Sequence, residues 1–149
     1  EAMGKDLKDL KIVSCHLGNG SSITAVQGGK SIDTTMGFTP LDGVLMGTRC
    51  GSIDPAVVTY IMNKEGYTPD EMSEYMNKKC GFLGISGISS DSRDIEAAIL
   101  KGNERAYIAA STLAYQIKKY IGSYTAAMNG LDAIVWTAGM GENNPELRD

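Results

Sequence analysis

The sequence predicts an α/β fold: a three-stranded antiparallel meander, then several helices, then a further buried strand. Two short glycine-containing turns separate three β-like runs within residues 10–35. Apolar residues then recur at helical spacing, and a compact apolar run follows at 133–136. Strands that come before and after several helices are typical of a mixed sheet with helices packed against it.

The meander is predicted from the spacing of its turns. Residues 10–15 form an apolar run short enough for a buried strand, and residues 22–26 and 31–35 supply the next two strands. A Gly-Asn-Gly turn at 18–20 and a Gly-Gly turn at 28–29 separate them, and both residue types tolerate positive φ. Turns this short join neighbouring antiparallel strands.

Capping signals predict three helices in the middle of the chain. An Asp-Pro pair at 54–55 supplies an N-cap and a first-turn proline for the first helix. The Thr-Pro-Asp-Glu stretch at 68–71 is a capping-box pattern for the second, which should stop near residues 80–81. A Ser-Asp pair at 90–91 caps a shorter third helix, through Leu100.

A long helix and a last strand are predicted for the remainder. The helix begins at Asn103, runs for about seven turns and is closed by an Asn-Gly pair at 129–130. The compact apolar run at 133–136 is typical of a strand buried on both faces, and an Asn-Pro pair at 144–145 predicts another helix start. The apolar stripe of the long helix consists of Ala106, Ala110, Leu113, Ile117, Ile121, Tyr124 and Met128.

Composition narrows the class of protein. The chain has 149 residues, of which 42% are hydrophobic, which suits one compact domain. Its net charge of −4 is scattered along the chain, which argues against a nucleic-acid or membrane-surface partner. Its three cysteines form no C-x-x-C pair, and no His/Cys/Asp cluster has metal-ligand spacing. No apolar run is long enough for a membrane span. We therefore expect a soluble cytoplasmic protein with reduced thiols and no metal ligands.

The first candidate site is the turn after the first strand. Gly18 and Gly20 let backbone N–H groups approach an anion, and Asn19 adds a neutral donor. His16 stands at the strand end, where it reaches the same anion. An ordinary β-turn is the alternative on the residues alone, because Gly-Asn-Gly is a common hairpin sequence.

Two other glycine-rich segments are candidates. Arg49 lies in a loop among glycines, and arginine is the side chain best shaped for bidentate contact with phosphate or carboxylate; a surface arginine is the alternative. Residues 139–143 follow the last strand, at the strand end where ligands collect in α/β sheets. Asn144 occupies the position of the third glycine of a dinucleotide fingerprint, so a Rossmann site is disfavoured. Asp91 and Arg93 by themselves suggest only a helix cap and a solvated charge.

Four segments together resemble the acetate kinase family in residue identity, order and spacing. They are residues 15–23, 33–55, 90–95 and 137–143, so the resemblance extends over nearly the whole chain. The family belongs to the superfamily of acetate and sugar kinases, Hsp70 and actin. The resemblance therefore implies a ribonuclease H-like, actin-like ATPase fold. It also implies that residues 1–149 are a single domain, the incomplete C-terminal domain of a longer enzyme.

The resemblance implies reversible in-line transfer of the γ-phosphoryl group of ATP to acetate, giving acetyl phosphate and ADP, with Mg²⁺ accompanying the nucleotide. Arg49 and His16 are the expected catalytic residues. Ser92 stands where the family usually carries a bulky apolar residue, so weaker stacking on the adenine is expected. The resemblance also implies the nucleotide- and phosphate-binding residues, which are His16, Gly18, Asn19, Gly20, Asp91, Ser92, Arg93, Gly139, Met140, Gly141 and Asn143.

Two other functions remain open at this point: a propionate or butyrate kinase, and a non-catalytic nucleotide-binding module of the actin or Hsp70 type. A non-catalytic module does not explain why an arginine stands at position 49 in a glycine-rich loop. The expected partners are acetate and ATP, with no nucleic acid and no membrane, and the family resemblance implies a homodimer for the full-length enzyme. The isolated segment is expected to be inactive because half of the cleft lies outside it.

Overall fold

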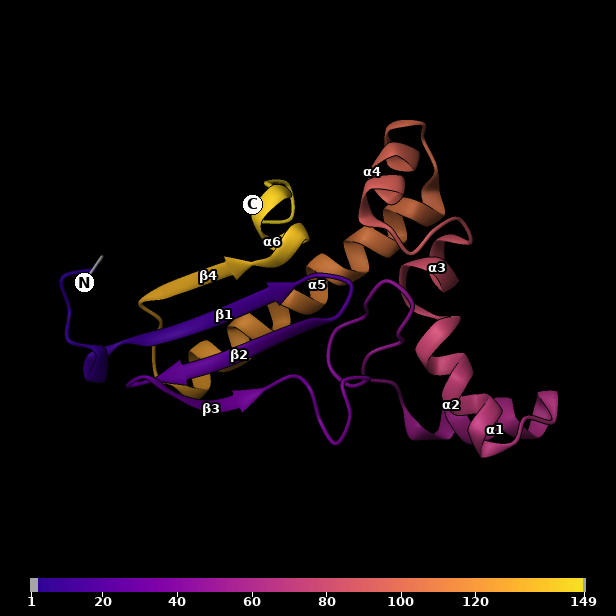
Figure 1. Cartoon of the computed structure of the whole chain (residues 1–149), viewed down its shortest axis with the longest axis horizontal. Coiled ribbons are helices and arrows are strands. Elements are labelled where there is room, and N and C mark those ends of the chain that lie inside the picture. The colour runs from indigo at the N-terminus through magenta and orange to yellow at the C-terminus, as the bar shows by residue number, and fades with distance from the viewer. Residues whose placement is uncertain (1–2, 149) are drawn as a thin grey trace.

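The computed structural model describes residues 3–148, and Figure 1 shows the arrangement of its elements. A short 3₁₀ helix at Leu7–Asp9 precedes the first strand. The strands are β1 (Lys11–Leu17), β2 (Ser21–Gln27), β3 (Lys30–Thr34) and β4 (Ala133–Thr137). The helices are α1 (Pro55–Glu65), α2 (Pro69–Lys78), α3 (Gly81–Ser86), α4 (Ser92–Leu100), α5 (Glu104–Ala127) and α6 (Ala138–Asn143).

The sheet has the order β3-β2-β1-β4 and is mixed, as predicted. The first three strands form the expected antiparallel meander, in which Lys11 of β1 lies opposite Gln27 of β2. β4 then pairs with β1 in parallel, from Ile12 opposite Ala133 to His16 opposite Thr137. Because β1 and β4 point the same way, both end on the side of the sheet that faces α3 and α4 (Figure 1).

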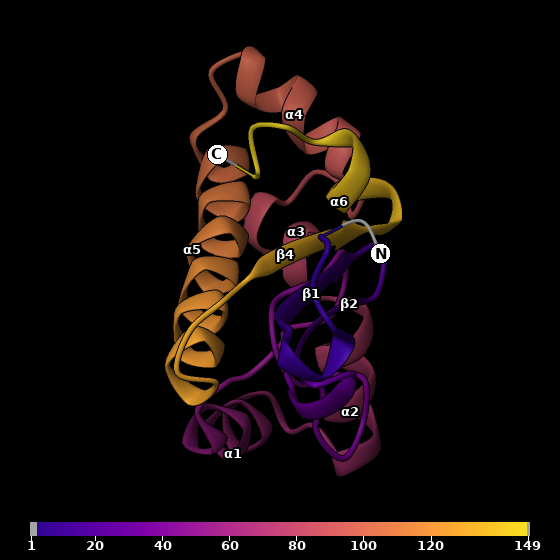
Figure 2. The ribbon, with the colours of Figure 1, turned by 90° about the vertical axis from the view of Figure 1, so that its left-hand side faces the viewer.

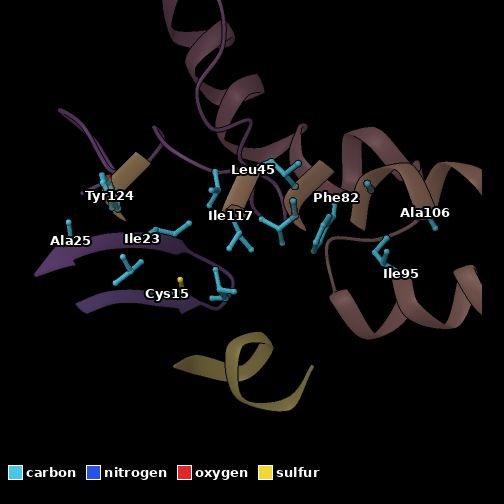
Figure 3. Packing of buried hydrophobic residues seen from close by; sticks show 14 of the residues in the cluster. Cys15, Ile23, Ala25, Leu45, Phe82, Ile95, Ala106, Ile117 and Tyr124 are labelled. Atoms are coloured by element: carbon cyan, nitrogen blue, oxygen red, sulfur yellow. The ribbon is translucent and has the colours of Figure 1, made fainter. Parts of the chain in front are cut away.

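The core lies between one face of this sheet and α5. Figure 2 shows α5 running along that face, and Figure 3 shows side chains of the two layers meeting. Ile23 on β2 and Ile117 on α5 are both almost wholly buried. Phe82 and Ile95 continue the same cluster toward α3 and α4. Each large aliphatic side chain buried in this way stabilises the fold by about 1.5–3 kcal/mol.

The predicted helix caps are confirmed, and each satisfies a backbone N–H that the first helical turn leaves unpaired. Asp54 accepts a hydrogen bond from the N–H of Ala56, and Asn103 accepts one from that of Ala106. Thr68 and Glu71 make both bonds of the capping box at the start of α2. The apolar stripe of α5 is mostly buried as expected and packs on the sheet and on α3 and α4, although Ala110 and Ile121 are only partly buried.

The prediction that the last strand is buried on both faces is wrong. Ile134 and Val135 of β4 are 37% and 41% exposed. β4 forms an edge of the sheet in the described residues, with β1 as its neighbour there. An apolar run therefore identified the strand correctly but not its position at the edge of the sheet, where α5 packs on β1 and β2 and leaves much of β4 uncovered.

Two further differences concern short helices. The segment after β4, expected as a loop before a helix at 144–145, is itself the helix α6, and Asn144 is its C-cap residue. α3 was not expected at all. Its first N–H groups, those of Phe82 and Leu83, donate to the carbonyls of Met46 and Gly47, so long-range contacts define its start. Within residues 3–148, no helix has the length and apolar character needed to cross a membrane.

Candidate functional site

The turn between β1 and β2 packs tightly against the start of α6. A Cβ added to Gly18 would lie 3.5 Å from the Cβ of Ala138 and 3.4 Å from the carbonyl oxygen of Gly20. The N–H of Gly18 donates to that carbonyl at 3.2 Å, and the hydroxyl of Ser21 donates to the carbonyl of Gly18 at 3.1 Å. The turn is therefore compact, and a Cβ at Gly18 would be in ordinary van der Waals contact with the start of α6.

His16 connects this turn to β4. It lies opposite Ser22 on one side and Thr137 on the other, and its side chain is exposed. Its Nδ1 and the hydroxyl oxygen of Thr137 form a hydrogen bond of 3.0 Å. Nε2 is on the side of Gly18, 4.0 Å from where a Cβ on that glycine would be. The ring is thus held by one nitrogen, while the other nitrogen faces the turn.

Three of the predicted motifs line one cavity of about 580 Å³, which we call the three-motif cavity. The hairpin turn, the start of α4 and the helix α6 each form a wall. His16, Gly20 and Gly141 are not in its lining. The lining residues are Gly18, Asn19, Gly47, Ser90, Asp91, Ser92, Arg93, Glu96, Gly139, Met140, Asn143 and Asn144.

Gly47 explains why two of these walls stand so close together. It is buried, and a Cβ added to it would lie 2.8 Å from Oδ1 of Asn19 and 2.8 Å from the carbonyl oxygen of Ser90. The backbone of the loop at residues 46–52, which we call the Arg49 loop, is thus in contact with the hairpin and with the segment that precedes α4. A residue without a side chain is needed there.

Asp91 and Arg93 form the wall at the start of α4. The Arg93 guanidinium donates to both carboxylate oxygens of Asp91, at 3.0 and 2.6 Å, and the backbone N–H of Arg93 donates to the same side chain at 2.9 Å. The hydrogen bonds from Arg93 lower the pKa of Asp91 to about 2. Asp91 is also the N-cap of α4, and the Arg93 side chain is 85% exposed. The helix cap and the solvated charge expected from these residues alone are therefore both present, at the edge of the cavity.

The third wall begins with an unusual backbone conformation. Ala138 has a φ of 65°, in the left-handed region that side-chain-bearing residues rarely adopt. It turns the chain directly from β4 into α6. The amide of Asn143 donates to the carbonyl of Gly139 at 2.9 Å and so closes the short helix. Gly141 is buried in this helix. A Cβ added to Gly141 would lie 3.5 Å from the carbonyl oxygen of Cys15.

Arg49 lies beside the hairpin rather than on an open surface. It is half-buried, and one of its terminal nitrogens, Nη1, donates to the carbonyl of Pro40 at 3.3 Å. The same nitrogen is 3.2 Å from where a Cβ on Gly20 would be. The N–H of Met46 donates to the carbonyl of Arg49 at 3.1 Å and closes the loop that carries the arginine.

A second cavity of about 590 Å³, the Arg49 cavity, lies next to the first. Asn19 lines both, so the tip of the hairpin separates them. The polar face of α2 forms the opposite wall. Its lining consists of Asn19, Thr48, Arg49, Asp70, Ser73, Glu74, Asn77 and Lys78.

Four lining residues of the three-motif cavity were not predicted: Gly47, Ser90, Glu96 and Asn144. Glu96 lies one helical turn after Ser92, so the periodicity of α4 places it on the same face. The amide of Asn144 donates to a carboxylate oxygen of Glu96 at 2.6 Å and joins the rims of α4 and α6. In residues 3–148, no three His, Cys, Asp or Glu side chains lie close enough to hold a metal ion.

Comparison with known proteins gives a consistent result. A family model described as "Acetokinase family" matches residues 1–149. An acetate kinase of Clostridium botulinum (strain Alaska E43 / Type E3) is 61% identical over 148 residues, which is 99% of this chain and 37% of the relative. The chain therefore spans little more than a third of the length of such relatives.

Solved structures show the same correspondence. The crystal structure of Porphyromonas gingivalis acetate kinase superposes with a TM-score of 0.97 at 49% identity, over 99% of this chain and 37% of that one. A propionate kinase from Francisella tularensis subsp. tularensis SCHU S4 gives a TM-score of 0.90 at 44% identity, over 95% of this chain and 36% of that one. The predicted actin-like ATPase fold is therefore confirmed.

Proposed function

The chain belongs to the acetokinase family, and we propose on this basis that it is part of an ATP-dependent acetate kinase. The reaction is reversible in-line transfer of the γ-phosphoryl group of ATP to acetate, giving acetyl phosphate and ADP. Residues 1–149 supply an incomplete C-terminal ribonuclease H-like domain, which carries the nucleotide side of the cleft. A complete cleft requires further residues, so the isolated chain is expected not to transfer phosphoryl groups.

One observation carries this proposal: three sequence-distant motifs line a single cavity, and Arg49 lines the adjoining one. A volume of about 580 Å³ lies within the usual range for small-molecule sites. A nucleoside placed between α4 and α6 directs its phosphates over the hairpin turn. The terminal phosphoryl group then arrives beside Arg49, since Asn19 borders both cavities.

The residues divide into those for the phosphoryl group and those for the nucleoside. Phosphoryl transfer requires in-line positioning and neutralisation of charge on the equatorial oxygens, and the planar guanidinium of Arg49 meets both needs. Nε2 of His16 adds a hydrogen-bonding group from the strand end. Gly18 and Gly20 keep the turn free of side chains, so its backbone approaches the phosphates closely.

The nucleoside would lie between two walls. On one side Asp91 fixes Arg93, and Ser92 leaves room where a larger side chain would stack on the base. On the other side Gly139 and Met140 form the floor, with Gly141 packed beneath them and Asn143 at the edge. Met140 is half-buried and offers an apolar surface to the base.

Mg²⁺ is proposed to accompany ATP, as nucleotide phosphates usually bind it while the ion keeps several waters. The described residues hold no cluster fit for a metal ion, so no step of the proposal depends on one. The proposed partners are small molecules, acetate and ATP. For the full-length enzyme we propose a homodimer in the cytoplasm.

A propionate kinase is the second candidate, because a solved propionate kinase superposes on this chain with a TM-score of 0.90. The full-length protein should be assayed for acyl phosphate formation from ATP with acetate, propionate and butyrate. We expect the highest kcat/KM with acetate. A higher value with propionate would favour the second candidate. ATP binding without transfer to any of the three acids would contradict the kinase proposal and leave a nucleotide-binding module.

A further inference from the structure

Two cysteines line one cavity where the Arg49 loop packs against the junction of α2 and α3. Cys50 directly follows Arg49, and Cys80 stands between the end of α2 and the start of α3. Both are half-buried, and both line one cavity of about 280 Å³. The Sγ of Cys50 lies 3.1 Å from the carbonyl oxygen of Gly51.

The backbone holds these two cysteines side by side. The N–H of Cys80 donates to the carbonyl of Thr48 at 2.9 Å, and the N–H of Cys50 donates to the carbonyl of Met76 at 3.0 Å. A Cβ added to Gly81 would lie only 2.9 Å from the carbonyl oxygen of Arg49. The Arg49 loop is therefore hydrogen-bonded to residues 76 and 80 and lies in close contact with Gly81.

The two thiols differ in acidity from an ordinary cysteine. The neighbouring Cys80 thiol lowers the pKa of Cys50 to about 7, and the neighbouring Cys50 together with burial raises the pKa of Cys80. The Sγ of Cys80 lies 3.6 Å from the carbonyl oxygen of Tyr75. Burial and the negative charge of Asp42 oppose the lowering at Cys50 without cancelling it. Lys79 and Tyr75 line the same cavity. A thiol with a pKa of about 7 is partly ionised at neutral pH, and the thiolate is the form that reacts with oxidants.

Cys15 provides a contrast within the same chain. It is wholly buried in the core between the sheet and α5, and burial raises its pKa to about 12. Buried thiols in apolar surroundings are inert. Reactivity is therefore expected at the Cys50–Cys80 pair and not at Cys15.

We propose that Cys50 and Cys80 form a redox modification site, in which a hydroperoxide converts the pair to a disulfide beside Arg49. The Cys50 thiolate attacks the outer oxygen of the hydroperoxide, the O–O bond breaks, and the leaving oxygen takes a proton from water. The resulting sulfenic acid is attacked by the sulfur of Cys80, an S–S bond forms, and the hydroxyl leaves as water with the proton of Cys80. The two thiols lose two electrons, and the hydroperoxide gains them.

Closure of the disulfide displaces the arginine. An S–S bond of about 2.05 Å would replace the present contacts of the two sulfur atoms, that of Cys50 Sγ with the Gly51 carbonyl oxygen and that of Cys80 Sγ with the Tyr75 carbonyl oxygen. Because Cys50 directly follows Arg49, we expect this rearrangement to shift the backbone of Arg49. A displacement of about 1 Å at a positioned catalytic group costs on the order of 100-fold in rate. This consequence rests on the proposed kinase function, whereas formation of the disulfide does not.

The first test is chemical. The reduced full-length protein is treated with hydrogen peroxide, blocked with iodoacetamide, digested and examined by mass spectrometry. We expect a peptide that joins Cys50 to Cys80, formed equally in the Cys15→Ser variant, absent in Cys80→Ser, and released by dithiothreitol. Separate oxidation or alkylation of the two cysteines, with no joined peptide in the wild type, would overturn the proposal.

The second test measures phosphoryl transfer on the same samples. We expect peroxide to lower the wild-type rate by tenfold or more, on the order that a displaced group loses, and dithiothreitol to restore it. The Cys50→Ser variant should keep its rate under the same treatment. A joined peptide with an unchanged rate would overturn the connection to Arg49. Absence of transfer even in the reduced protein, with the joined peptide present, would instead contradict the proposed function.

Discussion

Replacement of Gly47 by alanine tests whether the close contact between the Arg49 loop, the hairpin and the start of α4 shapes the nucleotide site. The glycine has no left-handed φ, so its backbone accepts alanine and the effect is steric alone. The new methyl group would meet Oδ1 of Asn19 and the carbonyl oxygen of Ser90, each at 2.8 Å. Asn19 can rotate away. The backbone at Ser90 must move, because 2.8 Å is about 0.6 Å short of ordinary van der Waals contact.

The expected loss follows from this overlap. Added methyl groups in closely packed regions cost about 1–3 kcal/mol. A part of this cost will lower the free energy of unfolding. The rest will lower the binding free energy of ATP, because the displaced Ser90 backbone widens the cavity around the nucleoside. A loss of 1.4 kcal/mol in binding corresponds to a tenfold weaker Kd. We therefore expect ATP to bind about tenfold more weakly to Gly47→Ala.

The assay is calorimetric titration of the full-length protein with ATP, together with thermal unfolding of each variant. Gly122→Ala is the matched control, because a Cβ there meets nothing within 4 Å on the exposed side of α5. Alanine should stabilise that helix by about 0.5–1 kcal/mol and leave ATP affinity unchanged. Wild-type affinity in Gly47→Ala would refute the placement of the nucleotide in the three-motif cavity.

Substitutions at three other positions give independent predictions. Arg49→Ala should lower kcat by about 10³-fold or more, because phosphoryl transfer depends on charge neutralisation, whereas the Kd for ATP should change only a few-fold. Arg49→Lys should recover a part of the rate. Normal turnover in Arg49→Ala would contradict the catalytic role. Ser92→Phe should tighten ATP binding about tenfold through stacking on the adenine, in the same titration, and no change would mean that the base does not lie on residue 92. Asp91→Asn keeps the cap of α4 but removes the ion pair with Arg93. The pKa of Asp91 falls from 3.8 to about 2 in the folded protein. The stabilisation by the ion pair is therefore present above about pH 4 and is lost as the pH falls through about 2. Thermal unfolding of both proteins should therefore differ at pH 5–7 and converge near pH 2, and an equal difference at both ends would contradict the assignment.

The elements predicted correctly are those with signals inside their own sequence. Asp54, Thr68 and Asn103 cap helices through atoms within three residues, so their patterns suffice. α3 lacks such a signal, because its first turn is held by carbonyls of the Arg49 loop more than thirty residues earlier in the chain. The exposure of Ile134 and Val135 depends on which helices cover the edge of the sheet where β4 lies, and this cannot be predicted from the sequence of the strand alone.

The site follows the same division. The hairpin, the segment at 91–93 and the segment at 139–143 were recognised as motifs, and the structure brings parts of all three to one cavity. The close packing of these segments at Gly47 was not predicted. Glycine has no side chain that would suggest a role, and Gly47 matters only because a Cβ there would contact Asn19 and Ser90. The helical form of residues 138–143 was also missed, because it depends on the left-handed backbone of Ala138.

The pairing of β1 with both β2 and β4 has a consequence for the order of folding. β1 and β2 are joined by a short turn and can pair early, whereas His16 and Thr137, neighbours in the sheet, are 121 positions apart in the chain. Closing so long a loop is entropically costly and slow, so parallel pairing follows local pairing. One wall of the three-motif cavity, α6, is attached directly to β4. The ability to hold a nucleotide should therefore arise only in the last step of folding, and on the ribosome only after residue 143 has emerged.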